Sequence, residues 1–175
     1  MPTIFVSIGS NLEPRKHIAM ALDVLRDQFG DLQLSPVYVT EAVGFNGRAF
    51  LNLVISLESD DSPYEVKKIF KKIEADLGRI KRESNFSPRR IDLDIILYGD
   101  SIIHQPGLEL PSKEIDKYAF VLQPLADLAP KMLYPGRDLS FSSLWKQALK
   151  NGDMGEGRKI DWNVAGYSTG TKYQY

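Results

Sequence analysis

The fold of this chain is decided by residues 88–99, whose sequence is Pro88-Arg89-Arg90-Ile91-Asp92-Leu93-Asp94-Ile95-Ile96-Leu97-Tyr98-Gly99. Apart from its two acidic residues, the run from 91 to 97 is apolar and rich in β-branched side chains, and Gly99 ends it. This pattern predicts a buried β-strand. Successive strand side chains point to opposite faces, so Asp92 and Asp94 share one face. Two like charges there are costly unless a positive group lies between them.

A divalent cation is the first candidate for that positive group. Mg²⁺ favours carboxylate oxygens and usually keeps water and substrate phosphates as its other ligands. Arg89 and Arg90 lie just before the acidic pair and carry guanidinium groups that suit phosphate. The motif therefore predicts a metal-assisted phosphoryl or nucleotidyl transfer site. The structural alternative is a salt-bridged strand end at the surface of a sheet.

The composition excludes several other classes of protein. A length of 175 residues, with 43% hydrophobic and 26% charged residues, is typical of one globular domain with a real core. A net charge of -1 gives no basic field for nucleic acid, and no apolar run approaches the length of a membrane span. The absence of cysteine excludes disulfides and thiolate metal sites and fits a reducing compartment. No secretory signal is evident, so we expect a cytoplasmic monomer that binds neither nucleic acid nor membranes.

Helical and extended patterns alternate along the chain. Apolar residues repeat at helical spacing in residues 18–29, with Ser10 or Asn11 as the expected cap, and again in residues 66–77, after Ser62-Pro63. Further helices are expected near residues 118–126 and 140–149. Extended segments are predicted at residues 3–8, 32–40, 50–57 and 91–97, and Pro36 favours an edge position for the second.

These elements predict an α+β sandwich, in which helices pack on one mostly antiparallel sheet. We expect residues 1–151 to form the domain and residues 152–175 to form an irregular tail. The polar segments 41–48 and 79–88 are candidate lids beside the acidic strand.

Six motifs stand in order between about residues 4 and 135. They are Ile8-Gly9-Ser10-Asn11-Leu12, Tyr38-x-Thr40 with Gly44, Phe50-Leu51-Asn52, Ile73-Glu74 with Gly78-Arg79, Pro88-Arg89-x-x-Asp92-Leu93-Asp94-Ile95, and Phe120-Val121-Leu122-x-Pro124-Leu125 with Ala129-Pro130. Together they resemble one family, the 6-hydroxymethyl-7,8-dihydropterin pyrophosphokinases of folate biosynthesis. These enzymes transfer pyrophosphate from ATP to a pterin alcohol.

The resemblance implies a ferredoxin-like fold for the domain, two Mg²⁺ ions, and ATP and a dihydropterin as substrates. Asp92 and Asp94 match the family's metal ligands, and Arg79 and Arg89 match catalytic arginines that contact phosphate. The ions would stabilise the attacking and leaving oxygens together.

The resemblance also implies the residues that bind each substrate. The pterin side comprises Thr40, Val43, Phe50, Asn52, Phe86 and Phe120. The ATP side comprises Glu74, Lys81, Arg82, Arg89, Ile95, Lys113 and Lys117. Taken alone, Phe50 and Phe120 could be core aromatics, and Glu74 could pair with Lys67 or Lys71. Asn52 is unusual inside a strand, because a buried amide needs partners.

Two positions on the ATP side depart from the family pattern, and Glu41-Ala42-Val43 also lacks the proline that is often seen beside the pterin. Ser112 stands where a His is usual and Tyr118 where an Arg is usual, and both usual residues help to hold the ATP phosphates. Lys113 and Lys117 lie nearby and could replace them as point charges, without the guanidinium fork. Three functions therefore stay open: an active pyrophosphokinase with a reworked phosphate clamp, a paralogue for another alcohol or nucleotide, and a catalytically silent pterin- or nucleotide-binding protein.

Overall fold

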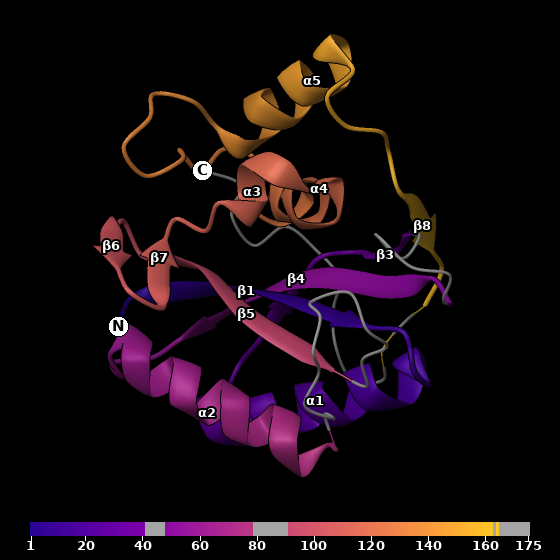
Figure 1. Cartoon of the computed structure of the whole chain (residues 1–175), viewed down its shortest axis with the longest axis vertical. Helices are drawn as coiled ribbons and strands as arrows, with labels where there is room; N and C mark the ends of the chain where they lie inside the picture. Colours follow the sequence, from indigo (N-terminus) through magenta and orange to yellow (C-terminus); the bar gives the residue numbers. More distant parts are fainter. Residues whose placement is uncertain (41–47, 79–90, 163, 165–175) are drawn as a thin grey trace.

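A six-stranded sheet forms the middle layer of the molecule, with helices on both of its faces (Figure 1). The computed structural model describes residues 1–40, 48–78, 91–162 and 164. The candidate lids therefore lie almost wholly outside the described residues. The helices are α1 (Pro14–Phe29), α2 (Pro63–Asp76), α3 (Glu114–Lys117), α4 (Ala119–Leu128) and α5 (Phe141–Asn151). Helices α1 and α2 cover one face of the sheet, and α3, α4 and α5 lie on the other.

The strands run in the order β5-β1-β4-β3-β8, and β2 also pairs with β4. Every pairing between them is antiparallel, and β6 and β7 form a separate hairpin. The strands are β1 (Thr3–Ser10), β2 (Gln33–Leu34), β3 (Val37–Thr40), β4 (Phe50–Glu58), β5 (Asp92–Tyr98), β6 (Ile103–Gln105), β7 (Leu108–Leu110) and β8 (Arg158–Ile160). This arrangement confirms the predicted α+β class with a mostly antiparallel sheet.

Two apolar cores hold the layers together, one on each face of the sheet. The first contains Ile18, Leu22 and Phe70 from α1 and α2, packed against the sheet. The second contains Val121 and Leu125 from α4, together with sheet residues on the opposite face. Because strand side chains alternate, each central strand supplies both cores, and β1 is buried almost throughout.

The two long helices begin in different ways. Helix α2 begins as predicted: Ser62 caps it, Pro63 occupies the first turn, and Glu65 completes a reciprocal capping box. For α1 the prediction was wrong, because its N-cap is Glu13, at a φ of 42° and without a side-chain cap bond. Ser10 belongs to β1, and the amide of Asn11 donates to the carbonyl of Arg48. Both residues therefore stabilise the end of β1 and its contact with the segment at Arg48, and neither caps α1.

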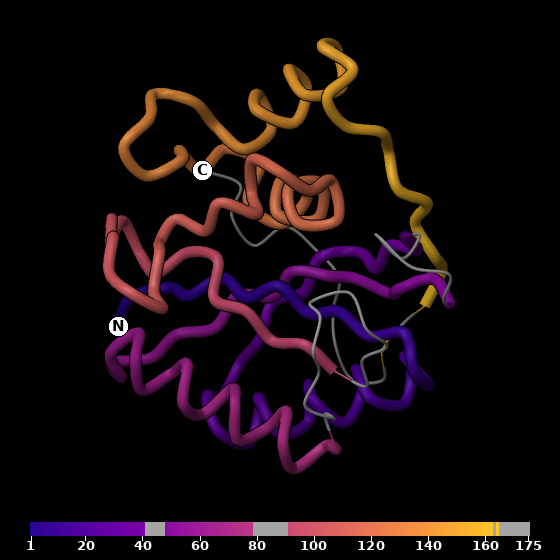
Figure 2. The backbone as a smooth tube through the Cα atoms, in the orientation of Figure 1, coloured from indigo at the N-terminus to yellow at the C-terminus, as the bar shows by residue number. Residues whose placement is uncertain are grey.

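The segment after α5 returns to the sheet and adds a strand that the sequence did not indicate (Figure 2). Strand β8 pairs with β3, so β3 is an interior strand and the edge position predicted from Pro36 was wrong for β3, whereas β2 pairs with β4 alone among the described strands. Pro36 lies in the break between β2 and β3, where no ladder bond is needed. Beyond β8, Val164 is buried in the core under α1 and α2.

No helix in the described part of the chain is both long enough and apolar enough to span a membrane.

A polar anchor joins α3 to the chain that follows α4. Arg137 donates two hydrogen bonds to the Asp116 carboxylate, at 2.7 and 2.8 Å, and the hydroxyl of Tyr134 donates a third at 3.1 Å. Burial, together with the adjacent Asp116 charge, raises the pKa of Tyr134 to about 12. The folded protein therefore keeps a proton that the unfolded chain loses near pH ~10.

We expect the free energy of unfolding to depend on this proton. Its contribution is complete below pH ~10 and is lost as the pH rises toward ~12, because only the folded state holds the proton in that interval. Denaturant titrations should show a steeper loss of stability above pH ~10 in the wild type than in Tyr134→Phe. Tyr64→Phe, which removes an exposed tyrosine of α2, should keep the wild-type slope. Equal slopes in all three proteins would contradict this role of Tyr134.

Candidate functional site

The antiparallel registers align side chains of five strands in one lateral row. Asp92 of β5 pairs with Gly9 of β1, which pairs on its other side with Asn52 of β4. Asn52 in turn pairs with Tyr38 of β3, and Tyr38 pairs with Lys159 of β8. Directly paired residues in a sheet point to the same face. The row therefore lies on one face, and it is the face that α4 crosses.

The acidic pair lies at one end of this row, on the terminal strand of the sheet. Asp92 and Asp94 are half-buried on the row's face, while Leu93 between them is only 1% exposed and points into the opposite core. The strand is thus apolar on one face and acidic on the other. The sequence had placed the pair deeper in the core. Its partial exposure lowers the cost of holding two carboxylates together.

The donor set of this pair fits a magnesium ion that shares its coordination with other groups. Within the described ranges, no cluster of three or more His, Cys, Asp or Glu side chains could hold a metal ion. Two carboxylates on one strand face leave most positions of an octahedral ion to water and phosphate oxygens, as Mg²⁺ prefers. Asp92 and Asp94 are the residues that would hold it.

Glu74 fixes the backbone of β5 between the two aspartates. Its side chain is only 2% exposed, and one carboxylate oxygen accepts a hydrogen bond of 2.8 Å from the amide of Leu93. The other oxygen pairs with Lys71 at 3.1 Å, which is one of the two ion pairs foreseen for Glu74. A buried strand-edge amide is thereby satisfied, and β5 is held to α2. The expected contact of Glu74 with ATP stays a prediction.

The residues expected on the pterin side surround the middle of the row. The amide of Asn52 donates to the Thr40 hydroxyl at 2.6 Å, and Phe50 lies on the same face of β4. A side chain at Gly9 would place Cβ 2.8 Å from the Asn52 amide oxygen and 3.8 Å from the Phe50 ring. Phe120, near the start of α4, is partly buried against the core between α4 and the sheet. Four of the six expected residues therefore lie along this face or on the helix that crosses it.

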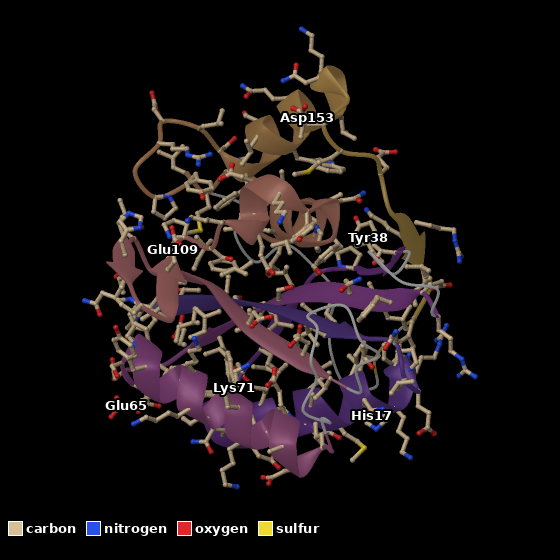
Figure 3. The ribbon with its side chains drawn as sticks, viewed as in Figure 1. His17, Tyr38, Glu65, Lys71, Glu109 and Asp153 are labelled. Atoms are coloured by element: carbon tan, nitrogen blue, oxygen red, sulfur yellow. The ribbon has the colours of Figure 1, made fainter. Side chains whose placement is uncertain are left out.

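A cavity of about 110 Å³ lies beside the acidic pair, between α2, β5 and the β6–β7 hairpin. Asp94 and Ile95 line it together with Lys67, Lys71 and Glu109, and Figure 3 labels the last two. Ile95 is among the residues expected to contact ATP, whereas these two lysines were not expected from the sequence as site residues, and the role of all three in binding stays a prediction. Their spacing of four on α2 was the available signal, because it places both on one helix face.

The region of the two family departures is occupied by local contacts. The amide of Ser112 donates to the carbonyl of Ile96, and its hydroxyl accepts from the amide of Glu114. The ring of Tyr118 stacks on Phe120, with centroids 4.8 Å apart, and the Lys117 ammonium lies over the Tyr118 ring, 5.1 Å from its centroid. Lys113 pairs with Glu109 at 3.1 Å.

Six of the expected site residues cannot be placed. Arg79, Lys81, Arg82, Phe86 and Arg89 fall in residues 79–90, and Val43 falls in residues 41–47, all outside the described residues. Their roles stay predictions that rest on the motifs alone.

A model of the family described as 7,8-dihydro-6-hydroxymethylpterin-pyrophosphokinase (HPPK) matches residues 5–130. The chain belongs to this family. The matched stretch runs from β1 into the chain after α4, so it contains the acidic pair, the row as far as Tyr38, and Phe120. It ends before α5 and β8.

Individual relatives support the same assignment. The chain is 37% identical to the 2-amino-4-hydroxy-6-hydroxymethyldihydropteridine pyrophosphokinase of Pseudomonas aeruginosa over 142 residues, which is 78% of this chain and 86% of that protein. The Aquifex aeolicus protein of the same name is 33% identical over 77% of this chain and 85% of its own length. The chain is therefore an enzyme, and its class is that of the pyrophosphokinases.

Solved structures show the same fold at low sequence identity. A crystal structure of Plasmodium falciparum HPPK-DHPS superposes with a TM-score of 0.70 at 12% identity. It covers 86% of this chain, but this chain spans only 42% of that longer protein. The likeness supports the ferredoxin-like fold expected from the motifs.

The contact of Glu74 with β5 gives a test of how the acidic strand is held. Glu74→Ala should lower the free energy of unfolding by about 1–3 kcal/mol, because it leaves the buried Leu93 amide without its acceptor. Glu74→Gln keeps an acceptor oxygen for the Leu93 amide and loses the charge that pairs with the half-exposed Lys71, so it should cost less than Glu74→Ala, under about 1 kcal/mol. Denaturant unfolding measures both. Asp76→Ala, which removes an exposed ion pair with Lys72, is the control. Equal losses for Ala and Gln would rule out the hydrogen bond as the cause.

Proposed function

We propose that this chain transfers pyrophosphate from ATP to the hydroxymethyl group of 6-hydroxymethyl-7,8-dihydropterin and releases AMP, with Mg²⁺ bound at Asp92 and Asp94. The observation that carries the proposal is the row in which Asp92, Gly9 and Asn52 are direct neighbours on one sheet face. It joins a carboxylate pair suited to Mg²⁺ with a carboxamide suited to the edge of a heterocycle. The names of the relatives supply the chemistry, and one relative in fission yeast is named a folic acid synthesis protein.

The pterin would lie across the middle of the row. A carboxamide offers both a donor and an acceptor, which matches the alternating groups on a pterin edge. The hydrogen bond to Thr40 restricts the Asn52 amide, so the amide would lose less conformational entropy when the ligand binds. Phe50 and Phe120 would contribute aromatic surface above and below the ring.

ATP would approach from the side of β5 that faces α2 and the hairpin. The cavity lined by Asp94, Ile95 and Lys71 lies there. Lys67 also lines it and adds a second positive charge. Ser112 is engaged by backbone contacts and Lys113 by Glu109, so Lys117 is the better candidate for the phosphate contact that the usual Arg would make. The magnesium ions would neutralise developing charge on the phosphate oxygens.

The reaction needs no covalent intermediate with the protein. The pterin hydroxyl oxygen would bond to the β-phosphorus, the bond from that phosphorus to the oxygen bridging the α-phosphorus would break, and AMP would depart with the electron pair. The hydroxyl proton would pass to solvent. In the described ranges, neither histidine belongs to the row: His17 bonds the carbonyl of Leu12, and His104 lies on β6 beside Glu109.

A product assay tests the proposal directly. Purified protein with Mg²⁺, ATP and 6-hydroxymethyl-7,8-dihydropterin should release AMP in step with a pyrophosphorylated pterin. Binding of dihydropterin by calorimetry without AMP would instead support the catalytically silent protein. Neither binding nor AMP would favour a paralogue with another substrate.

Asp94→Asn should lower the rate of AMP release at least a hundredfold, or about 2.7 kcal/mol of transition-state stabilisation. The change removes a charged metal ligand without removing core volume, so circular dichroism and the unfolding midpoint should stay at the wild-type values. Asp100→Asn, an exposed carboxylate in the turn after β5, is the matched control and should keep full activity. Unchanged turnover in Asp94→Asn would defeat the metal assignment.

Gly9→Ala tests the pterin side of the row. The added Cβ would lie closer to the Asn52 amide oxygen than carbon and oxygen tolerate, and Asn52 is only 4% exposed, so the amide must turn away from its position. We expect the KM for dihydropterin to rise about tenfold, or about 1.4 kcal/mol, with the KM for ATP within about twofold of the wild type. Gly155→Ala, where a Cβ would meet open space, is the control. A rise in the KM for ATP alone would contradict the placement of the pterin.

A further inference from the structure

The chain beyond the family match contacts the helix that carries Phe120. After α5, residues 152–162 descend past α4 to the edge of the sheet, where β8 pairs with β3 (Figure 2). The amide of Gly157 donates to the side-chain oxygen of Gln123 on α4 at 2.8 Å. Lys159 forms an ion pair of 3.8 Å with Asp127, also on α4. One short segment therefore bonds both to β3 and to α4.

Tyr38 of β3 takes part in the same contacts from the side of the sheet. Its side chain is only 1% exposed, and its hydroxyl donates to the Asp127 carboxylate. In Figure 3, Tyr38 is labelled between α4 and the sheet edge that β8 completes. Lys159 lies over the Tyr38 ring, 5.8 Å from its centroid. Burial and the neighbouring Asp127 raise the pKa of Tyr38, so its hydroxyl stays protonated and able to donate.

These contacts lie on the helix face that also carries Phe120. Gln123 and Asp127 follow Phe120 by three and seven residues, a spacing that places all three on one side of a helix. The contact with Gly157 therefore lies one turn from the ring of Phe120. On the sheet side, Tyr38 is the direct cross-strand neighbour of Asn52.

We propose that Gly157 and Lys159, with Tyr38, Gln123 and Asp127, form a strap that sets the height of α4 over the sheet and so the width of the dihydropterin slot between Phe120 and Asn52. The inference rests on the proposed function, because it assigns the slot to the dihydropterin. The five residues act as positioning residues: they touch α4 and β3, and the substrate meets only the groups that they hold.

Apolar packing does not explain this network by itself. Val121, Leu122 and Leu125 already bury one side of α4 in the core, and their packing sets the approximate distance between helix and sheet. Hydrogen bonds impose fixed distances, so the polar contacts of Gln123 and Asp127 specify how closely the helix approaches β3. Gly157 is part of this close approach, because a Cβ there would lie 3.3 Å from both the Gln123 oxygen and the Tyr38 ring.

The experiment compares substrate constants in the full-length chain. Tyr38→Phe and Asp127→Ala should each raise the KM and the calorimetric Kd for dihydropterin about five- to tenfold, while kcat and the KM for ATP stay within about twofold. Lys159→Ala, which changes a side chain that is 56% exposed and cannot disturb folding greatly, should give a smaller rise of about twofold. The double variant Tyr38→Phe/Asp127→Ala should be no worse than Asp127→Ala alone, because that variant already lacks the acceptor of the Tyr38 hydroxyl.

Tyr64→Phe is the matched control, since it removes a tyrosine hydroxyl that bonds Gln105 far from α4. Unchanged dihydropterin constants in folded Tyr38→Phe and Asp127→Ala would overturn the strap and leave the proposed function intact. Parallel losses for dihydropterin and ATP, following the loss of thermal stability, would show a general structural role and would also overturn it. A wild-type protein that neither binds dihydropterin nor releases AMP would overturn the proposed function, and the strap with it.

Discussion

The antiparallel register of β1 with its two neighbours is the constraint on which the site depends. Gly9 pairs with Asp92 on one side and with Asn52 on the other. These two pairings place a carboxylate suited to a metal ion and a carboxamide suited to the edge of a heterocycle on one face. Because side chains alternate along a strand, a slip of one residue in either pairing would turn one group into the opposite core. The two cores oppose such a slip, since β1 contributes apolar side chains to both of them.

The same constraint explains why the central position of the row is a glycine. Asp92 and Asn52 lie on opposite sides of Gly9, and the amide oxygen of Asn52 extends over it to within 2.8 Å of the place where a Cβ would be. A larger residue would fill the space between the two groups and push them apart. The missing side chain thus lets the Asn52 amide extend over β1 toward the strand that carries the carboxylates.

The sequence predicted the parts of this arrangement that depend on local patterns. The alternation of apolar and acidic residues around Leu93 predicted the two-faced strand, and Ser62 with Pro63 predicted the start of α2. The order of six motifs predicted the family. Prediction failed where distant partners decide the local structure: the three residues of β8 have no strand pattern of their own, and β3 supplies their hydrogen bonds. Likewise, Glu74 has the spacing of a surface ion pair, and only the fold shows that it accepts from the amide of Leu93.

Different kinds of interaction therefore support the two ends of the row, at β5 and at β3. At the β5 end, a buried carboxylate of α2 holds the strand edge between Asp92 and Asp94, within the part of the chain that the whole family shares. At the β3 end, the contacts to α4 involve Gly157 and Lys159, which lie beyond that shared part. The ring of Tyr118 stacks on Phe120 at the first turn, and the strap holds α4 from the second turn onward. The position of Phe120 over the sheet is thus set by contacts at two successive turns of α4, one from Tyr118 and one from the strap.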